Sequence, residues 1–185
     1  MKVMPLALAE VMVIEPQVFG DARGFFYESF NRREFEAVLG RTLDFVQDNH
    51  SRSQRDVLRG LHYQIRQPQA KLMRVVAGEI FDVVVDIRKS SSTFGRWVGT
   101  VLSAQSNKHL WIPEGFAHGF LVLSESAEVQ YKTTDYWAPE HERAIAWDDP
   151  ALGIAWPLAG GHGGQPVLSA KDRAAVRLSA AECFE

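Results

Sequence analysis

The sequence predicts an all-β protein, an antiparallel sandwich or barrel with a few short helices, and three observations lead to this fold class. Short runs rich in β-branched and aromatic residues recur along most of the chain, and Gly, Pro and Ser turn residues separate them. The run at 79–88 alternates between one apolar set of residues and a second set that contains Asp82 and Asp86, which is the period of a half-buried strand. Only one stretch has the signals of a clear helix.

The strands are expected in chain order as follows. We interpret the N-terminal apolar run as a first strand, not a signal peptide, because Pro5 and Glu10 interrupt it and no cleavage site of small residues follows. A strand at 12–14 ends before Pro16, and a turn at 20–24 leads into a run of β-forming residues. Further strands are expected at 45–51, 57–64, 71–78, 79–88, 96–103, 108–113, 118–124 and 128–137.

The clear helix begins after Asn31, where Glu34 completes a capping-box pattern, and it ends at Gly40. After the last strand the chain is rich in turn residues, and it includes a glycine tract at 160–164 that we interpret as a flexible loop. The run at 168–182 is expected to form a short helix that packs back on the barrel.

Length and composition predict one domain, residues 1–185, of about the usual size. The net charge of −3, without a block of Lys or Arg, argues against a protein that binds nucleic acid or a membrane surface. No segment approaches the roughly 20 apolar residues of a membrane span. Cys183 is the single cysteine, so no internal disulfide is possible and we expect a cytoplasmic protein.

The motif PEGFAHGF at 113–120 predicts a turn that leads into a strand, with Gly115 free to adopt a positive φ and His118 near the strand start. It resembles the second motif of cupin-type jelly-roll barrels, many of which hold a metal with a His-x-His pair. The comparable place here reads His62-Tyr63-Gln64, so one ligand is missing. A metal site needs three or more well-placed ligands, and we therefore expect none.

His62 is the main candidate for chemistry, although a lone strand histidine is more often a core residue than a catalytic one. Arg59, Lys71, Arg74 and Tyr131 also occur in runs otherwise suited to burial, where a charge is costly unless it is paired or binds a ligand. Such a lumen suits a small anionic ligand that carries a carbonyl group. A histidine can then remove a proton α to the carbonyl, a lysine can stabilise the enolate, and a tyrosine can return the proton.

Several blocks together resemble the dTDP-4-dehydrorhamnose 3,5-epimerase family: RGLHYQ, AKLMRVVAGEIFDVVVDIRKSSSTFGRWVG, LWIPEGFAHGF, YKTTDYW and LSAKD. The resemblance extends from the GDARGFFYESF segment to LSAKD, nearly the whole chain. It implies a cupin-type jelly roll, a homodimer that shares strands, and no cofactor. It also implies the conversion of dTDP-4-dehydro-6-deoxy-D-glucose to dTDP-4-dehydro-L-rhamnose, a step of dTDP-L-rhamnose biosynthesis.

The resemblance assigns four catalytic residues. His62 is the base, Asp172 its partner in a dyad, Lys71 the group that holds the enolate, and Tyr131 the acid. An Asp that accepts from one ring nitrogen makes the other nitrogen a better base. Inversion needs an acid on the opposite face of the sugar from the base. The rival interpretations are a surface acid for Asp172 and strand filler for Tyr131.

The resemblance also implies a set of substrate-binding residues: Arg23, Glu28, Gln47, Asp48, Asn49, Arg59, Lys71, His118, Glu142 and Lys171, with Trp137 stacked on thymine. For charged residues such as Glu142 and Lys171, the alternative is an ordinary solvated surface position. Arg23 and Glu28 lie near the N-terminus, and a swapped strand would let them complete the partner's site.

One geometric condition follows from the spacing of Arg59 and His62. Residues three apart on a regular strand point to opposite faces, so both can face the lumen only if the strand is irregular between them. Gly60 is suited to a bulge, and we predict an irregularity at 59–61. The unmatched glycine tract at 160–164 makes the placement of Asp172 the least secure part of the site.

Three other functions stay open on sequence grounds. The first is a single-site 3- or 5-epimerase acting on another dTDP-4-ketosugar, for which the same residues serve. The second is a non-catalytic barrel that binds sugar nucleotides, and the joint presence of His62, Tyr131 and Asp172 argues against it. The third is a metal-dependent cupin oxygenase, opposed by the missing ligand at Gln64.

Overall fold

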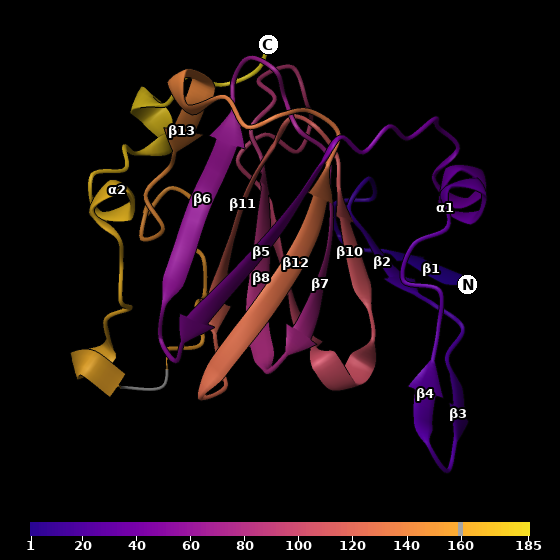
Figure 1. Cartoon of the computed structure of the whole chain (residues 1–185). Helices are drawn as coiled ribbons and strands as arrows, with labels where there is room; N and C mark the ends of the chain where they lie inside the picture. The colour runs from indigo at the N-terminus through magenta and orange to yellow at the C-terminus, as the bar shows by residue number, and fades with distance from the viewer. Residues whose placement is uncertain (159–160) are drawn as a thin grey trace.

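The computed structural model describes residues 1–158 and 161–185, and two antiparallel sheets face each other in it (Figure 1). The six-stranded sheet has the order β1 (Lys2–Pro5), β2 (Met12–Glu15), β10 (His109–Ile112), β7 (Lys71–Ala77), β12 (Ser126–Thr133) and β5 (Gln47–Gln54). The five-stranded sheet has the order β13 (Glu142–Ala144), β6 (Leu58–Gln64), β11 (Phe116–Val122), β8 (Glu79–Asp86) and β9 (Trp97–Ser103). The predicted all-β jelly roll is confirmed.

The helices are short and lie at the margins of the barrel. They are α1 (Arg32–Leu39), α2 (Ala170–Arg173) and four 3₁₀ turns at Ala104–Ser106, Pro139–His141, Gly161–Gly164 and Leu178–Ala180. Gly160, the first residue of the glycine tract, lies outside the described residues. Among the described helices, none is long and apolar enough to cross a membrane.

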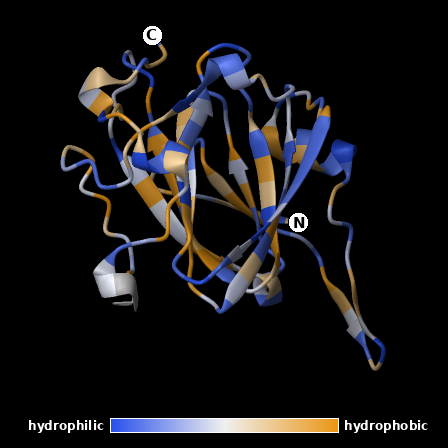
Figure 2. Cartoon of the chain, turned by 60° about the vertical axis from the view of Figure 1, so that its left-hand side comes forward, coloured by the Kyte–Doolittle hydropathy of each residue, from blue (hydrophilic) through white to orange (hydrophobic). Residues whose placement is uncertain are grey.

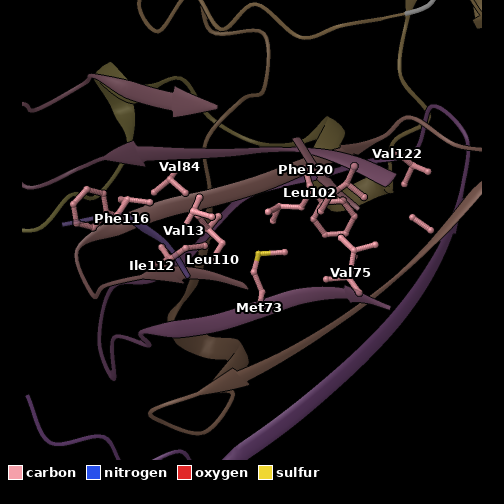
Figure 3. Packing of buried hydrophobic residues seen from close by; sticks show 14 of the residues in the cluster. Val13, Met73, Val75, Val84, Leu102, Leu110, Ile112, Phe116, Phe120 and Val122 are labelled. Atoms are coloured by element: carbon pink, nitrogen blue, oxygen red, sulfur yellow. The ribbon is translucent and has the colours of Figure 1, made fainter. Parts of the chain in front are cut away.

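The main core fills the space between the two sheets (Figure 3). Met73 and Val75 of β7 meet Val84 of β8 and Phe120 of β11, and all four side chains are at most 6% exposed. Burial of such side chains stabilises the fold by roughly 1.5–3 kcal/mol each. At one end of the barrel, polar side chains line the space between the sheets instead, and these form the candidate functional site.

Strand β8 differs from its predicted half-buried pattern, because both of its faces are covered. Val84 packs in the core between the sheets, whereas Val83 and Val85 pack under the C-terminal part of the chain with Ile145 and Leu152. Period-two alternation identifies the two faces of a strand, but it does not reveal that a distant segment will cover the second face.

Helix α1 has the predicted bounds, and Gly40 ends it in the left-handed conformation with φ 65°. The predicted capping box is wrong. Within the described residues the Asn31 side chain caps no helical amide, and it donates to Glu28 Oε2 at 3.0 Å. Phe35 anchors the helix instead, fully buried against the outer face of the six-stranded sheet. This shows that packing, not capping, fixes the helix, as is usual for short helices.

The predicted C-terminal helix is shorter than the run at 168–182. Only Ala170–Arg173 is α-helical, and the Ser169 side chain caps it by accepting from the Asp172 amide. The segment nevertheless lies against the five-stranded sheet, where the amide of Leu58 donates to the carbonyl of Val167 at 3.0 Å. These contacts carry Asp172 to the barrel.

A hairpin formed by β3 (Phe19–Asp21) and β4 (Gly24–Phe26) projects away from the barrel (Figure 1). Its three phenylalanines, Phe19, Phe25 and Phe26, are between 56% and 67% exposed. In Figure 2 this hairpin carries apolar residues next to a hydrophilic tip. Hydrophobic side chains gathered on one projecting element are characteristic of a surface that contacts another molecule.

The predicted irregularity at 59–61 is confirmed. On β11, His118 pairs with His62 and Phe120 pairs with Arg59, so two steps on β11 match three on β6. Gly60 has φ 132°, and the Gly60–Leu61 peptide bond is cis. Because of the extra residue, the alternation of side chains between the two faces of the sheet is reversed at Gly60.

Replacing Gly60 by Ala is expected to destabilise the protein by about 2–4 kcal/mol. The new Cβ would lie 2.5 Å from Gly119 Cα and 2.9 Å from the His118 carbonyl oxygen, at a backbone angle that non-glycine residues rarely adopt. Urea denaturation of the two proteins measures the difference. A loss below about 0.5 kcal/mol, the usual scale of surface substitutions, would contradict this description of the bulge.

Candidate functional site

The site is a cavity of about 310 Å³ between the two sheets. Both sheets and the loop after β12 contribute to its lining, which consists of Gln47, Asn49, His62, Tyr63, Gln64, Gln69, Lys71, Tyr131, Trp137 and Glu142. Most of these side chains are polar, and two of them carry opposite charges. A cavity of this size and chemistry suits a small polar ligand.

His62 of β6, in the five-stranded sheet, forms a close pair with Asp172 of α2. Nε2 of His62 lies 2.5 Å from Oδ1 of Asp172, whose side chain is only 3% exposed. Ser169 Oγ donates to the other carboxylate oxygen at 2.7 Å, and the Gly60 amide donates to Oδ1 at 3.4 Å. Among the hydrogen bonds of the described residues, His62 Nδ1 has no protein partner, so it is the nitrogen available to a ligand.

The pKa values of the pair suit a base and its support. Burial lowers the pKa of the His62 imidazole below its usual 6.5 and outweighs the hydrogen bond with Asp172, which raises it. Burial alone would raise the pKa of the Asp172 carboxyl, but hydrogen bonds from His62 and Ser169 hold it below its usual value. His62 is therefore neutral at pH 7, next to a carboxylate that stabilises its protonated form.

On the facing sheet, Lys71 of β7 and Tyr131 of β12 line the same cavity. Burial lowers the pKa of Lys71 to about 8, although the charges of Asp82 and Glu142 partly offset this effect. Burial raises the pKa of the Tyr131 hydroxyl, so it keeps its proton at neutral pH. The cavity thus has a neutral imidazole on one sheet and a proton donor and a cation on the other.

Arg59 of β6 is exposed although its neighbours Leu58 and Gly60 are buried, and its Nε donates to Ser53 Oγ of β5 at 2.9 Å. Its positive charge lowers the pKa of Tyr131, against the effect of burial, so its electrostatic influence reaches the Tyr131 hydroxyl. With the bulge at Gly60, His62 lines the cavity, while Arg59 reaches across to β5 and acts on Tyr131.

The resemblance assigns Gln47, Asp48 and Asn49 of β5 to the nucleotide, but these residues lie on different faces of the sheet. Gln47 and Asn49 line the cavity, and Gln47 Nε2 donates to Asn49 Oδ1 at 2.9 Å. The side chain of Asp48 points to the other face of the sheet, where it accepts from Lys132 Nζ at 2.8 Å. Alternation along a strand produces this division.

The chain matches the family model for dTDP-4-dehydrorhamnose 3,5-epimerase over residues 5–180. It belongs to this family.

The similar proteins and solved structures are also epimerases. The dTDP-4-dehydrorhamnose 3,5-epimerase of Pseudomonas aeruginosa is 60% identical over 184 residues, which cover 100% of this chain and 99% of that protein. The crystal structure of the epimerase RmlC from Legionella pneumophila in complex with dTDP-4-keto-L-rhamnose superposes with a TM-score of 0.93 at 54% identity, covering 98% of this chain and 94% of that one. A 3'-monoepimerase from Streptomyces bikiniensis in complex with dTDP-quinovose gives 0.88 at 36% identity, covering 96% and 88%.

Two further residues that the epimerase resemblance assigns lie at the edge of the cavity. Glu142 of β13 lines it and accepts from Lys171 Nζ at 2.7 Å, and Lys171 is half exposed. Trp137 also lines the cavity and is 59% exposed.

His118 leads to a buried acid that the sequence reasoning did not assign to the epimerase site. Nε2 of His118 lies 2.8 Å from Oδ2 of Asp82, whose side chain is completely buried. The other oxygen, Oδ1, has no hydrogen-bond partner among the described residues. The charge of Asp82 also acts on Lys71. Its position gave no clear signal, because in a strand predicted to be half-buried an acid at Asp82 is expected on the exposed face.

The structure does not bring Arg23 and Glu28 to the cavity of their own chain. Arg23 lies at the hairpin tip, 88% exposed, and its guanidinium pairs with Asp21 at 2.5 Å. Glu28 accepts from Asn31 outside the barrel. Of the residues that the resemblance assigns to substrate binding in this family member, these two lie on the projecting N-terminal segment.

The described residues contain no group of three or more His, Cys, Asp or Glu side chains arranged to hold a metal ion. Gln64, at the position of the second ligand in the metal-binding cupin pattern, instead uses its amide to bind the loop that carries Trp137.

Proposed function

We propose that this protein is a dTDP-4-dehydrorhamnose 3,5-epimerase that converts dTDP-4-dehydro-6-deoxy-D-glucose to dTDP-4-dehydro-L-rhamnose. One observation carries the proposal: a neutral histidine backed by a carboxylate on one sheet faces a tyrosine and a lysine on the other across a single cavity. Inversion at carbon requires a base and an acid on opposite faces of the sugar, and the two sheets provide them.

The proposed reaction starts at a carbon next to the C4 carbonyl. His62 Nδ1 removes the proton from C3, the C–H electrons move into the enolate, and the Lys71 ammonium stabilises the charge on the C4 oxygen. The Tyr131 hydroxyl then donates its proton to the opposite face of C3. Transfer of the proton from the imidazolium to the tyrosinate through solvent restores both groups. The same cycle at C5, the other carbon next to C4, completes the conversion without a cofactor.

For the nucleotide, the proposal assigns the diphosphate to Arg59 and the base to the Trp137 indole. Arginine suits diphosphate because its planar fork binds two oxygens, and an indole offers a flat apolar face. Arg59 is exposed, and among the described residues its guanidinium donates only to Ser53, so most of its donors are free for a ligand.

The proposal includes a homodimer in which Arg23 and Glu28 of each chain complete the partner's site. Three exposed phenylalanines on the hairpin support it, since burial against a second copy would remove them from water. A cytoplasmic location is part of the proposal, because the sequence has a single cysteine and no internal disulfide.

A single-site epimerase is the second candidate, and the similarity to a 3'-monoepimerase favours keeping it. Incubation of the protein with dTDP-4-dehydro-6-deoxy-D-glucose in D2O, followed by NMR, separates the candidates. Deuterium at both C3 and C5 of the product is the expected result. Deuterium at one carbon would support the single-site epimerase, and no deuterium would leave only a binding protein.

The pH dependence of kcat/KM is expected to be bell-shaped. His62 must be neutral to accept a proton, so activity is present above its pKa and is lost as the pH falls through that value, below 6.5. Lys71 must be charged, so activity is lost as the pH rises through about 8. Initial rates across this range measure both limbs. A profile flat between pH 7 and 10 would contradict the role of Lys71.

Replacing Asp172 by Asn is expected to lower kcat by about 10²–10³-fold. The amide has nearly the same shape but no charge to stabilise the protonated imidazole, and its NH2 group can fix the wrong tautomer of His62. The pKa of His62 should fall further, so the acid limb of the pH profile should move to lower pH. An unchanged acid limb would show that Asp172 does not act on His62.

A further inference from the structure

The buried side chain of Gln64 holds the backbone on both sides of Trp137. Its Nε2 donates to the carbonyl of Tyr136 at 3.2 Å, and its Oε1 accepts from the amide of Ala138 at 2.8 Å. Nε2 also donates to the carbonyl of Gln67 at 2.8 Å. Because Gln64 is only 4% exposed, these bonds are shielded from bulk water. Trp137 is therefore attached between two fixed points.

Two other glutamines hold the same loop. Gln47 Oε1 accepts from the amide of Trp137 at 3.0 Å, and Gln69 Nε2 donates to the carbonyl of Asp135 at 2.8 Å. Gln47, Gln64 and Gln69 all line the cavity beside Trp137. Side-chain amides thus bind backbone groups at each residue of the loop from 135 to 138. Gln64 makes the most of these contacts.

The Trp137 ring has little other support. Its indole is 59% exposed, so packing by the rest of the barrel does little to fix its direction. A flat side chain that is held in its binding direction pays less conformational entropy when a base stacks on it. Loss of the loop contacts would leave Trp137 present but free to point elsewhere.

We propose that Gln64 is a positioning residue for nucleobase recognition: its amide clamps the backbone on both sides of Trp137 and presents the indole to the base of a nucleoside diphosphate. The inference rests on the proposed function, in which Trp137 stacks on the base. It also explains why glutamine stands two residues after His62, since the side chain is committed to the loop and not to a ligand in the cavity.

The test compares Gln64→Met, which keeps the length of the side chain and removes its hydrogen bonds, with Gln54→Met on the exposed end of β5. We expect Gln64→Met to raise the Kd for dTDP and the KM for the sugar nucleotide about ten-fold, with kcat changed less than about two-fold. Titration with inorganic pyrophosphate, which has no base, should give the wild-type Kd. Gln54→Met should match the wild type throughout.

A double-mutant cycle separates positioning from general stability. Trp137→Ala should weaken dTDP binding in the wild type, but it should have little further effect in Gln64→Met, because the ring is already misplaced there. Additive effects, an unchanged Kd in Gln64→Met, or an equal loss for pyrophosphate would overturn the inference while the epimerase activity stands. If wild-type protein bound no dTDP, the proposed function itself would fail. Should Gln64→Met not fold, Gln69→Met tests the same loop, with an expected loss of about three-fold.

Discussion

Replacing His62 by Gln is expected to lower kcat by about 10³-fold and to leave the Kd for dTDP within about three-fold of the wild type. Glutamine has an amide nitrogen that can reach Asp172 as Nε2 of His62 does at 2.5 Å, so the buried carboxylate keeps a donor. It has no group that accepts a proton near neutral pH. The loss should therefore appear in the chemical step and not in nucleotide binding.

Steady-state kinetics and calorimetry with dTDP measure the two quantities. The variant should also keep its melting temperature within a few degrees, because the change leaves the packing of the strand intact. Activity within about ten-fold of the wild type would contradict the assignment of His62 as the base. A large loss of dTDP affinity would instead mean that His62 acts mainly in binding.

Replacing Tyr131 by Phe is expected to lower the rate of inversion by about 10²–10³-fold. The change removes one hydroxyl and leaves the ring, which packs against the core between the sheets, so the fold should be unaffected. His62 can still remove the proton in this variant. Without a donor on the opposite face, the enolate can only be reprotonated from the side of His62, with retention of configuration.

Tyr136→Phe is the matched control, since Tyr136 lies on the loop at the cavity mouth and its side chain is 61% exposed. It should keep wild-type rates. Product configuration is followed by NMR coupling constants in both variants. Normal inversion in Tyr131→Phe would mean that another group, or water, protonates the far face of the sugar.

The strands of the barrel could be predicted from local sequence because turn residues and β-forming runs mark them at short range. The half-buried pattern expected for β8 was wrong because Val83 and Val85 are covered by residues about 60 positions further along the chain, such as Ile145. The capping box at Asn31 was also wrong, since Glu28 competes for the same side chain. Local patterns do not determine which of two possible partners a side chain binds.

The same limit applies to the functional site: features set by adjacent residues could be predicted, and contacts between distant residues could not. Gly60 between Arg59 and His62 was enough to predict the bulge, because the requirement and the residue that satisfies it are adjacent in sequence. The pair of His62 and Asp172 joins residues 110 positions apart, and only the family resemblance suggested it. Asp82 was missed because a buried acid and an exposed one look alike in an alternating strand.

The central claim is that base and acid act from opposite faces of the sugar, and hydrogen exchange in the Tyr131→Phe variant tests it most directly. The variant is incubated with dTDP-4-dehydro-6-deoxy-D-glucose in D2O, and the recovered sugar nucleotide is analysed by NMR. We expect deuterium at C3 or C5 with the original configuration, because His62 exchanges its proton with solvent and returns a deuteron to the same face. Deuterium with inverted configuration would contradict the two-face account, and so would the complete absence of exchange.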